Sequence, residues 1–418
     1  MKTPSDKVIE IESGAEAREI CQSELEKTLR AGAQRLLAEA IEAEVAEYLA
    51  AHMHERDEGG RRRVMRNGHH REREVITGVG AVRVRAPRVD DRAASERFRS
   101  TILPRYLRKS PSLENLIPSL YLHGVSGNDM AAALEAILGP GARGLSATTV
   151  GRLKEVWQAE FGAWSRRDLT GQRYVYLWAD GIYFNVRCED ARPCILVLVG
   201  AREDGVKELV AVVDGERESA ASWEELLLDL KTRGLAWAPA IAVGDGALGF
   251  WSALARQWPE AAAQRCWVHK TANVLDKLPK KLHGAAKDAI HQIYLAETRA
   301  DACAAFDTFG QKYSAKYPKA WHCLEKDRSA LLAFYDFPAA HWIHLRTTNV
   351  IESSFSMVRH RTRQTKGCGS RAATLALVYK LGRECENKWR RLNAQADVAK
   401  IVRGIRFTDG LEVLEQAA

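Results

Sequence analysis

The chain has 418 residues, of which 46% are hydrophobic and 28% charged, and a formal net charge of +8. This length allows two or three domains with a substantial core, and the composition is that of a soluble globular protein. No apolar run approaches the ~20 residues of a membrane span, no signal peptide opens the chain, and the eight cysteines include no CxxC pair, so a cytoplasmic protein without disulfides is expected.

Charge is unevenly distributed along the chain. Residues 1–50 carry 6 Lys and Arg against 11 Asp and Glu, whereas residues 51–110 carry 16 against 8 and residues 346–391 carry 11 against 3. Two separate basic segments indicate a polyanionic partner, most simply nucleic acid. A solvated charged surface would show the same runs, so charge alone does not establish the partner.

The first 58 residues form an acidic region that we expect to be helical. Apolar side chains recur on one stripe of a helix over residues 15–50, namely Leu25, Leu29, Leu36, Ile41, Val45 and Tyr48. This stripe could pack on the rest of the chain or on a second copy, and the sequence leaves both open.

Residues 59–165 are expected to form a DNA-binding region. Its first part contains a turn-forming Asn67-Gly68 and two short strands, 75–77 and 81–85, separated by glycines. Arginines in this part could lie on DNA phosphates, namely Arg61, Arg62, Arg63, Arg66, Arg83, Arg85 and Arg88. A polar hairpin that binds no DNA is the alternative interpretation.

The second part of this region is predicted to hold three helices between residues 113 and 160. Ser146 can cap the last of them, with Thr148, Thr149 and Arg152 on its outer side. A helix-turn-helix-like unit of this kind could place its last helix in a major groove. Three-helix bundles that bind no DNA are also common, and the pattern favours neither interpretation.

From Tyr174 the pattern changes to strands. Apolar runs at 174–186, 195–199 and 208–213, two of them joined by an Asp204-Gly205 turn, precede a helix, a short strand at 240–243 and a second helix. This order predicts an α/β fold with a ribonuclease-H-like core, in which an antiparallel meander leads into parallel strands. We expect the core to comprise residues 170–269 and 340–395, with an all-helical insertion at 270–339 and a C-terminal tail at 396–418.

The run Thr347-Thr348-Asn349-Val350-Ile351-Glu352-Ser353 is predicted to open a helix. Asn349 can cap it, with Glu352 in the capping-box position three residues later. Ile351, Phe355 and Val358 have the spacing of a buried face, and Glu352 begins a row that continues through Arg359 and Arg363. Taken alone, this run is explained by an amphipathic helix with a solvated charged side.

Two further carboxylates follow strands. Asp180 closes an apolar strand, Asp245 lies just past the end of another, and each is followed by glycine, where a substrate can approach the backbone. Functional sites form at the strand ends of α/β sheets. With Glu352, these residues offer enough oxygen ligands for two Mg²⁺ ions ~4 Å apart, which can clamp the attacking and leaving oxygens of a phosphodiester.

Several motifs together resemble the bacterial transposases of the mutator type, whose members share a ribonuclease-H-like DDE core. The matching segments are Trp178-Ala179-Asp180-Gly181-Ile182-Tyr183, Gly244 to Phe250, Gln264-Arg265-Cys266-Trp267-Val268-His269-Lys270, and Thr347 to Ser353 with Arg359-His360-Arg361-Thr362. The resemblance runs from about residue 60 to 410 and includes Arg66-Asn67-Gly68 and Pro87-Arg88. One departure is Val350, where the family pattern has proline.

The resemblance implies a DNA transposase that cleaves strand ends and joins them to target DNA through the freed 3′-hydroxyl. Asp180, Asp245 and Glu352 would bind Mg²⁺, or Mn²⁺ as a substitute, and catalyse both steps. Arg359, Arg361 and Arg363 would steady the scissile strand. Double-stranded DNA would be the partner, as the element's terminal inverted repeats and as target DNA. The protein would act as a homodimer or larger assembly in the bacterial cytoplasm, with the nucleoid when bound.

The Cys266-Trp267-Val268-His269 motif allows two interpretations. It contains half the ligands of a zinc site, but no second pair follows at matching spacing, so structural zinc is not expected. A buried cysteine with a hydrogen-bonded histidine is the simpler interpretation. A sharper hypothesis is that Trp267 or His269 contacts the DNA end, with Trp267 stacking on an unpaired base.

Two other functions are compatible with these residues. A ribonuclease-H-like DNA nuclease would cut without joining, and a domesticated DNA-binding regulator would have lost catalysis. The intact triad argues against the regulator, and the extensive N-terminal basic region argues against a simple nuclease.

Overall fold

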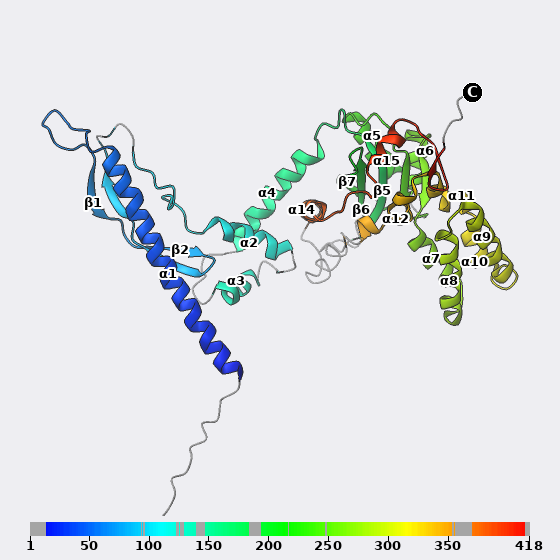
Figure 1. Cartoon of the computed structure of the whole chain (residues 1–418), viewed down its shortest axis with the longest axis horizontal. Coiled ribbons are helices and arrows are strands. Elements are labelled where there is room, and N and C mark those ends of the chain that lie inside the picture. The colour runs from blue at the N-terminus through cyan, green and yellow to red at the C-terminus, as the bar shows by residue number, and fades with distance from the viewer. Residues whose placement is uncertain are drawn as a thin grey trace, which may run out of the picture. The chain divides into compact units, whose positions relative to one another are not determined.

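The computed structural model describes residues 14–92, 94, 97–122, 125, 129–138, 147–183, 194–215, 217–246, 249–352, 355 and 370–413. The chain divides into two compact units, residues 1–151 and 152–418. Figure 1 shows the elements of each unit. Within the described residues, no helix combines the length and the apolar character needed to cross a membrane.

The N-terminal unit begins with the long helix α1, Gly14–Ala51, which confirms the helix expected over residues 15–50. Ile41 and Val45 are each 1% exposed and pack on the hairpin formed by β2, Arg73–Thr77, and β3, Gly80–Val84. The first half of the predicted stripe is different, because Leu25, Leu29 and Leu36 are 51–63% exposed. Only the second half of the stripe therefore packs on its own chain among the described residues.

This unit contains a second two-stranded sheet, which the sequence did not lead us to expect. Asn67 and Gly68 belong to a strand, β1, Met65–His69, which pairs with β4, Pro87–Asp90, and carries an irregularity between Arg66 and His69. The prediction of a simple turn is therefore wrong. Gly68 has φ of 66°, so its left-handed conformation is accommodated as a bulge within the ladder.

The three expected helices are present as α2, Pro111–Leu122, α3, Met130–Leu138, and α4, Ala147–Ser165. Leu113 and Ile117 of α2 form one buried cluster with Met130 and Leu134 of α3. Phe161 and Trp164 of α4 pack instead against Tyr379, with ring centroids 5.6 and 4.9 Å away. Ser146, the predicted cap of α4, lies outside the described residues.

The second unit is built on a five-stranded mixed sheet, so the α/β expectation is confirmed. Its strands in spatial order are β7 (Lys207–Gly215), β6 (Cys194–Arg202), β5 (Tyr174–Tyr183), β8 (Ile241–Gly244) and β9 (Ala262–Arg265). β5, β6 and β7 form an antiparallel meander, and β8 and β9 are parallel to β5. The predicted Asp204-Gly205 turn joins β6 and β7, with Gly205 at φ of 75°.

Both faces of this sheet are covered. On one face, Leu177, Leu196 and Leu198 pack against α5, Ala220–Thr232, and α6, Phe250–Gln257. On the other face, Trp178 donates from Nε1 to the His344 carbonyl at 2.9 Å, and the Tyr176 hydroxyl lies 2.6 Å from His341 Nδ1. Strands buried on both faces read as continuous apolar runs, which is why β5 and β6 were recognisable in the sequence.

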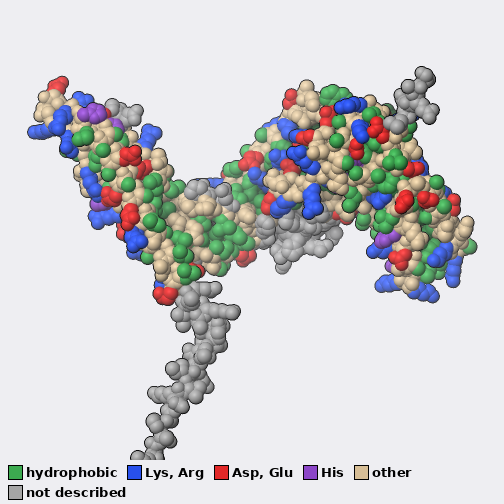
Figure 2. All heavy atoms as spheres, in the orientation of Figure 1, with side chains coloured by type: hydrophobic (Ala, Val, Ile, Leu, Met, Phe, Trp, Pro, Cys, Tyr) green, Lys and Arg blue, Asp and Glu red, His purple; other side chains and the backbone are tan. Residues whose placement is uncertain are grey.

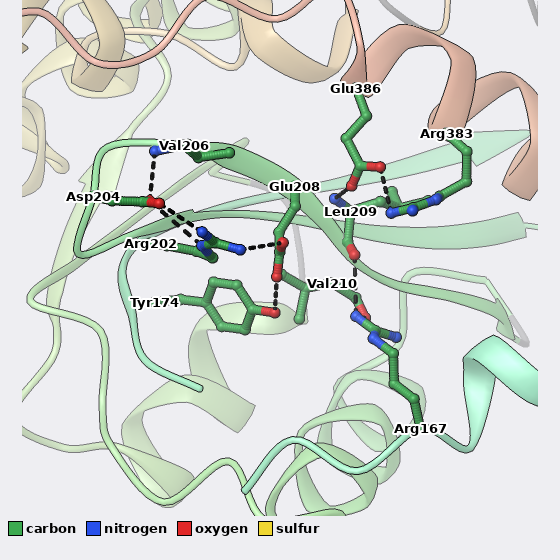
Figure 3. A network of polar contacts seen from close by, with 10 residues as sticks. All are labelled: Arg167, Tyr174, Arg202, Asp204, Val206, Glu208, Leu209, Val210, Arg383 and Glu386. Carbon is green, nitrogen blue, oxygen red and sulfur yellow. Dashed lines mark hydrogen bonds and ion pairs between the residues drawn. The ribbon is translucent and has the colours of Figure 1, made fainter. Parts of the chain in front are cut away.

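The free edge of β7 is closed by a polar network that also holds helix α14, Arg371–Glu386 (Figure 3). An irregularity in the β6–β7 pairing occurs opposite Leu198 and Val199. Near it, the Arg167 guanidinium donates to the carbonyls of Leu209 and Val210, each at 3.2 Å, and Glu386 accepts from Leu209 N at 2.6 Å (Figure 3). These side chains satisfy backbone groups that an edge strand would otherwise expose.

The expected helical insertion follows α7, Trp267–Leu275. It contains α8 (His283–Tyr294), α9 (Arg299–Tyr313), α10 (Pro318–Glu325) and α11 (Arg328–Leu331), with short 3₁₀ turns at Lys280–Leu282, Ala333–Asp336 and Ala339–His341. The chain then continues through α12 (Trp342–Leu345), α14, α15 (Ala396–Val402) and the small hairpin β10 (Phe407–Thr408) and β11 (Leu411–Glu412).

Candidate active site

The two predicted aspartates lie level on neighbouring parallel strands. Ala179 of β5 pairs with Gly244 of β8, so Asp180 and Asp245 occupy the next position on each chain. Neighbouring strands are about 4.8 Å apart, which brings the two backbones close together at this edge. Asp180 does not close its strand as expected, because β5 continues to Tyr183 along β6 while β8 ends at Gly244.

Both aspartates are held in place by their surroundings. Asp180 is 7% exposed, and its Oδ1 accepts from Gly181 N at 3.0 Å. Asp245 is half-buried, and its backbone carbonyl accepts from Trp251 Nε1 at 2.6 Å. The indole of α6 therefore fixes the position of the Asp245 backbone.

Cys266 directly follows β9, the third of the parallel strands, and lies level with Asp245. Gly244 pairs with Arg265 of β9, and Cys266 N donates to the Gly244 carbonyl at 2.8 Å. The buried Cys266 sulfur accepts from Thr348 N at 3.4 Å. This contact brings the segment around Thr348 to the edge of the sheet that carries Asp180 and Asp245.

Thr348 also connects Glu352 to this edge. Its hydroxyl lies 3.3 Å from Cys266 Sγ and donates to Glu352 Oε1 at 2.7 Å. Asn349 is already helical, so Thr348 and not Asn349 immediately precedes the helix, and the capping assignment of Asn349 is wrong. Ile351 and Phe355 are fully buried as predicted, whereas Val358 lies outside the described residues.

His269 lies beside Glu352 in the first turns of α7. Its Nδ1 is 3.6 Å from Glu352 Oε1 and is buried without a hydrogen bond. The neighbouring Cys266 sulfur, followed by the charges of Asp245 and Glu352, raises the pKa of His269 to about 9, although burial opposes the shift. The imidazolium form is therefore favoured at neutral pH, next to the acidic residues.

One acidic residue of this site was missed in the sequence. Glu218 precedes α5, and burial followed by the charges of Asp180 and Asp245 raises its pKa to about 7. A Cβ atom at Gly181 would lie only 2.1 Å from Glu218 Oε1, which places this carboxylate over the residue next to Asp180. Its position in a strand-to-helix connection was the available signal.

A second group of charged side chains contacts Trp251, the residue that holds the Asp245 backbone. The Arg265 guanidinium lies 3.8 Å from the centre of the Trp251 ring, and Arg265 Nε is 3.9 Å from Asp327 Oδ1. Asp327, between α10 and α11 of the insertion, also pairs with the 5% exposed side chain of Lys270. Lys270 in turn donates to the Cys323 carbonyl at 2.9 Å. The insertion therefore contacts the residues that hold the Asp245 backbone.

Trp267 does not have the exposure that DNA stacking requires. It is 1% exposed, donates from Nε1 to the Leu331 carbonyl at 2.9 Å, and packs against Tyr294 and Phe306. The hypothesis that Trp267 stacks on an unpaired base is therefore wrong for this structure. Trp267 instead anchors the insertion to the sheet.

The donor atoms at this edge suit a hard divalent cation. Asp180, Asp245 and Glu352 offer carboxylate oxygens, the ligands that Mg²⁺ and Mn²⁺ favour. Among the described residues, the group of three whose ligand atoms lie within 4.8 Å of one another is Cys266, His269 and Glu352, which does not include Asp180 or Asp245. A structural zinc site needs four protein ligands, and this group supplies three. The oxygen donors therefore fit the expected Mg²⁺ better than this group fits structural zinc.

The predicted DNA-binding arginines of the N-terminal unit are on its surface. Arg61, Arg62, Arg63, Arg66, Arg83, Arg85 and Arg88 are all exposed. Arg83 and Arg85 alternate with the buried Val82 and Val84, and Arg66 pairs with Glu42 at 2.7 Å. Figure 2 shows Lys and Arg side chains at intervals along this unit, with Asp and Glu between them.

The remaining predicted contacts are only partly described. Arg152 is exposed on α4, whereas at Thr148 and Thr149 the structure describes the helix but not the side chains. Arg359, Arg361 and Arg363 lie outside the described residues. Their predicted contacts with DNA stay predictions.

Sequence comparisons identify relatives across most of the chain. The family described as "Transposase, Mutator family" matches residues 5–392. The transposase for insertion sequence element IS6120 of Mycolicibacterium smegmatis is 52% identical over 298 residues, covering 71% of this chain and 92% of that protein. The transposase for element IST2 of Acidithiobacillus ferrooxidans is 50% identical over 289 residues (68% and 95%), and that for ISRM5 of Rhizobium meliloti is 30% identical over 371 residues (87% and 89%).

Proposed function

Because this chain belongs to the Mutator family of transposases, we propose that it moves an insertion sequence by metal-dependent cleavage and strand transfer at the element's ends. Asp180, Asp245 and Glu352 are the proposed catalytic and metal-binding triad. The observation that carries the proposal is the register of the parallel strands, which sets Asp180 and Asp245 level, together with the Thr348 hydroxyl that brings Glu352 to the same edge.

The proposed core is ribonuclease-H-like. Its support is the strand order β7-β6-β5-β8-β9, in which an antiparallel meander adjoins parallel strands and the helices cover both faces. In this arrangement the carboxyl ends of the parallel strands meet at one edge, where α/β sheets place their sites. The domain limits proposed from the sequence, with an insertion at 270–339 between two core segments, accord with this arrangement.

The chemistry follows from the residues at this edge. Two divalent cations held here would stabilise the charge on the attacking and leaving oxygens of an in-line displacement at phosphorus. We propose that Asp180, Asp245 and Glu352 would together hold these cations. His269 lies beside Glu352, with its Nδ1 3.6 Å from Glu352 Oε1, so its ring N–H can donate a hydrogen bond to a phosphate oxygen.

Isosteric replacement tests the triad. Asp180→Asn, Asp245→Asn and Glu352→Gln remove a negative charge at nearly constant shape, so each should abolish cleavage and joining while end binding persists. Asp288→Asn, at an exposed position on α8, is the control and should keep full activity. A triad variant that retained strand transfer would remove that residue from the triad, and activity in excess chelator would exclude the metal mechanism.

The same assays separate this proposal from its alternatives. A nuclease would yield cleaved ends that never join to target DNA, and a domesticated regulator would bind DNA without cleaving it. We propose joining because the named relatives are transposases. Detection of joined products that depend on Asp180, Asp245 and Glu352 would support the transposase over both alternatives.

We also propose that the N-terminal region binds the terminal inverted repeats of the element. The proposed assembly is a homodimer or larger on double-stranded DNA, acting in the bacterial cytoplasm and with the nucleoid when bound. Its support is the charge excess of residues 51–110 and the exposure of Arg83 and Arg85. Each lost phosphate contact lowers the slope of log affinity against log salt by about 0.9, so replacing both by alanine should lower the slope by about 2. An unchanged slope would remove these two arginines from the interface, with the exposed Arg256→Ala as control.

A further inference from the structure

Glu218 is fixed where the chain passes from β7 to α5. Arg217 has φ of 61°, a left-handed conformation that bends the chain sharply before Glu218. Ser219 then caps α5 by accepting from Ser222 N at 3.2 Å, and the Glu218 carbonyl accepts from Gly249 N at 3.0 Å. The backbone of Glu218 is thus held between the first turns of α5 and α6.

The Glu218 side chain extends from this point to β5. An ideal Cβ at Gly181 would lie 2.1 Å from Glu218 Oε1 and 2.5 Å from its Cγ, distances that real Cβ atoms essentially never show. Any other residue at position 181 would therefore displace this carboxylate. Neighbouring strand residues point to opposite faces, so Glu218 occupies the space at Gly181 on one face, while Asp180 Oδ1 accepts from Gly181 N at 3.0 Å.

The charge of Glu218 is not balanced by the described part of the chain. Among the described residues, no side chain donates a hydrogen bond or forms an ion pair with its carboxylate. The negative charges of Asp180 and Asp245 act on Glu218, and the positive charge of His269 acts in the opposite direction. Half-buried carboxylates crowded in this way repel one another unless one is protonated or a cation lies between them.

We propose that Glu218 is a fourth metal-binding carboxylate of this site, which joins Asp180 in holding one of the catalytic cations. The inference rests on the proposed function, because it adds a ligand to the metal site described there. Mg²⁺ takes six oxygen ligands, several of which are commonly water, so a fourth carboxylate can take the place of a water on one cation. In the chain, Glu218 follows β7 and Asp245 follows β8, and the Glu218 carbonyl accepts from Gly249 N at the start of α6.

Binding of Mn²⁺ to the full-length protein without DNA tests this inference. Electron paramagnetic resonance and calorimetry would compare wild type, Glu218→Gln and Glu225→Gln, the last being an exposed position on α5. Glu218→Gln should bind Mn²⁺ about 10-fold or more weakly, or bind fewer ions, whereas Glu225→Gln should match wild type. Mn²⁺ should also raise the free energy of unfolding of Glu218→Gln by less than it raises that of wild type.

Measuring Asp180→Asn in the same assay distinguishes failure of the fourth-ligand inference from failure of the proposed function. If Asp180→Asn loses Mn²⁺ while a folded Glu218→Gln binds it as wild type does, the fourth ligand is refuted and the proposed function stands. If neither change affects Mn²⁺ binding, the proposed metal site itself fails. Should Glu218→Gln not fold, Gly181→Ala decides, because its methyl group displaces the Glu218 carboxylate and leaves Asp180 in place. Wild-type Mn²⁺ binding by Gly181→Ala would then overturn the inference.

Discussion

Replacing Asp327 by asparagine tests whether the insertion holds the active-site edge in place. Asp327 pairs with Lys270 and lies 3.9 Å from Arg265, whose guanidinium stacks on Trp251. The side chains of Lys270 and Asp327 are only 5% and 18% exposed. Asparagine keeps the shape but leaves the buried Lys270 without its counter-ion, and breaking a buried ion pair costs about 3–5 kcal/mol.

An exposed ion pair in the same insertion provides a matched control for this prediction. Asp307 forms an ion pair with Arg328 at 2.9 Å in the same insertion, but its side chain is 59% exposed, so Asp307→Asn should cost no more than ~1 kcal/mol. Unfolding in guanidinium, followed by tryptophan fluorescence, would give the difference in free energy of unfolding. Strand cleavage should also fall in Asp327→Asn at temperatures where it is folded. Equal losses of stability in the two variants would refute the role assigned to the Asp327 group.

Two further changes address α7. Trp267→Ala should cost ~3–5 kcal/mol because it opens a cavity, whereas Trp267→Phe should cost about 1 kcal/mol for one lost hydrogen bond. The cleavage activity of Trp267→Ala should fall equally on duplex DNA ends and on DNA ends with pre-unpaired bases. A greater loss on duplex ends would instead support stacking of Trp267 on a base. The folded-state pKa of His269 is raised to about 9 from 6.5, so its stabilising effect is complete below pH 6.5 and is lost as pH rises through 9. Without divalent metal, the stability advantage of wild type over His269→Gln should therefore shrink between pH 7 and pH 10, and an advantage that grows with pH would contradict the assignment.

Local patterns in the sequence were sufficient for most elements of the fold. The buried strands β5 and β6 were recognisable as continuous apolar runs, and Asp204-Gly205 predicted the turn between β6 and β7. Both features depend on residues that are adjacent in the chain. The positions of Asp180 and Asp245 after apolar runs were predictable for the same reason. Local patterns failed at Asn67-Gly68, where a turn signal lies in a strand because β4 pairs with it.

Burial was harder to predict than secondary structure. Leu25, Leu29 and Leu36 share a helical stripe with Ile41 and Val45, yet the first three are more than half exposed and the last two are buried. Trp267 occurs in a motif with polar neighbours, and nothing near it in the sequence shows that Leu331, Tyr294 and Phe306 enclose it. Which face of a helix is buried depends on segments far away in the chain.

The sequence by itself determined the residue types of the proposed triad, the strands and helices that carry them, and the two basic segments. Only the tertiary structure decided that Thr348 bonds to Glu352 and approaches Cys266 across 82 residues, and that Glu218 reaches Gly181 from another connection. The physical reason is the range of the interactions. Turn chemistry and periodicity act over a few residues, whereas strand register and the crowding of carboxylates arise only once distant segments have packed together.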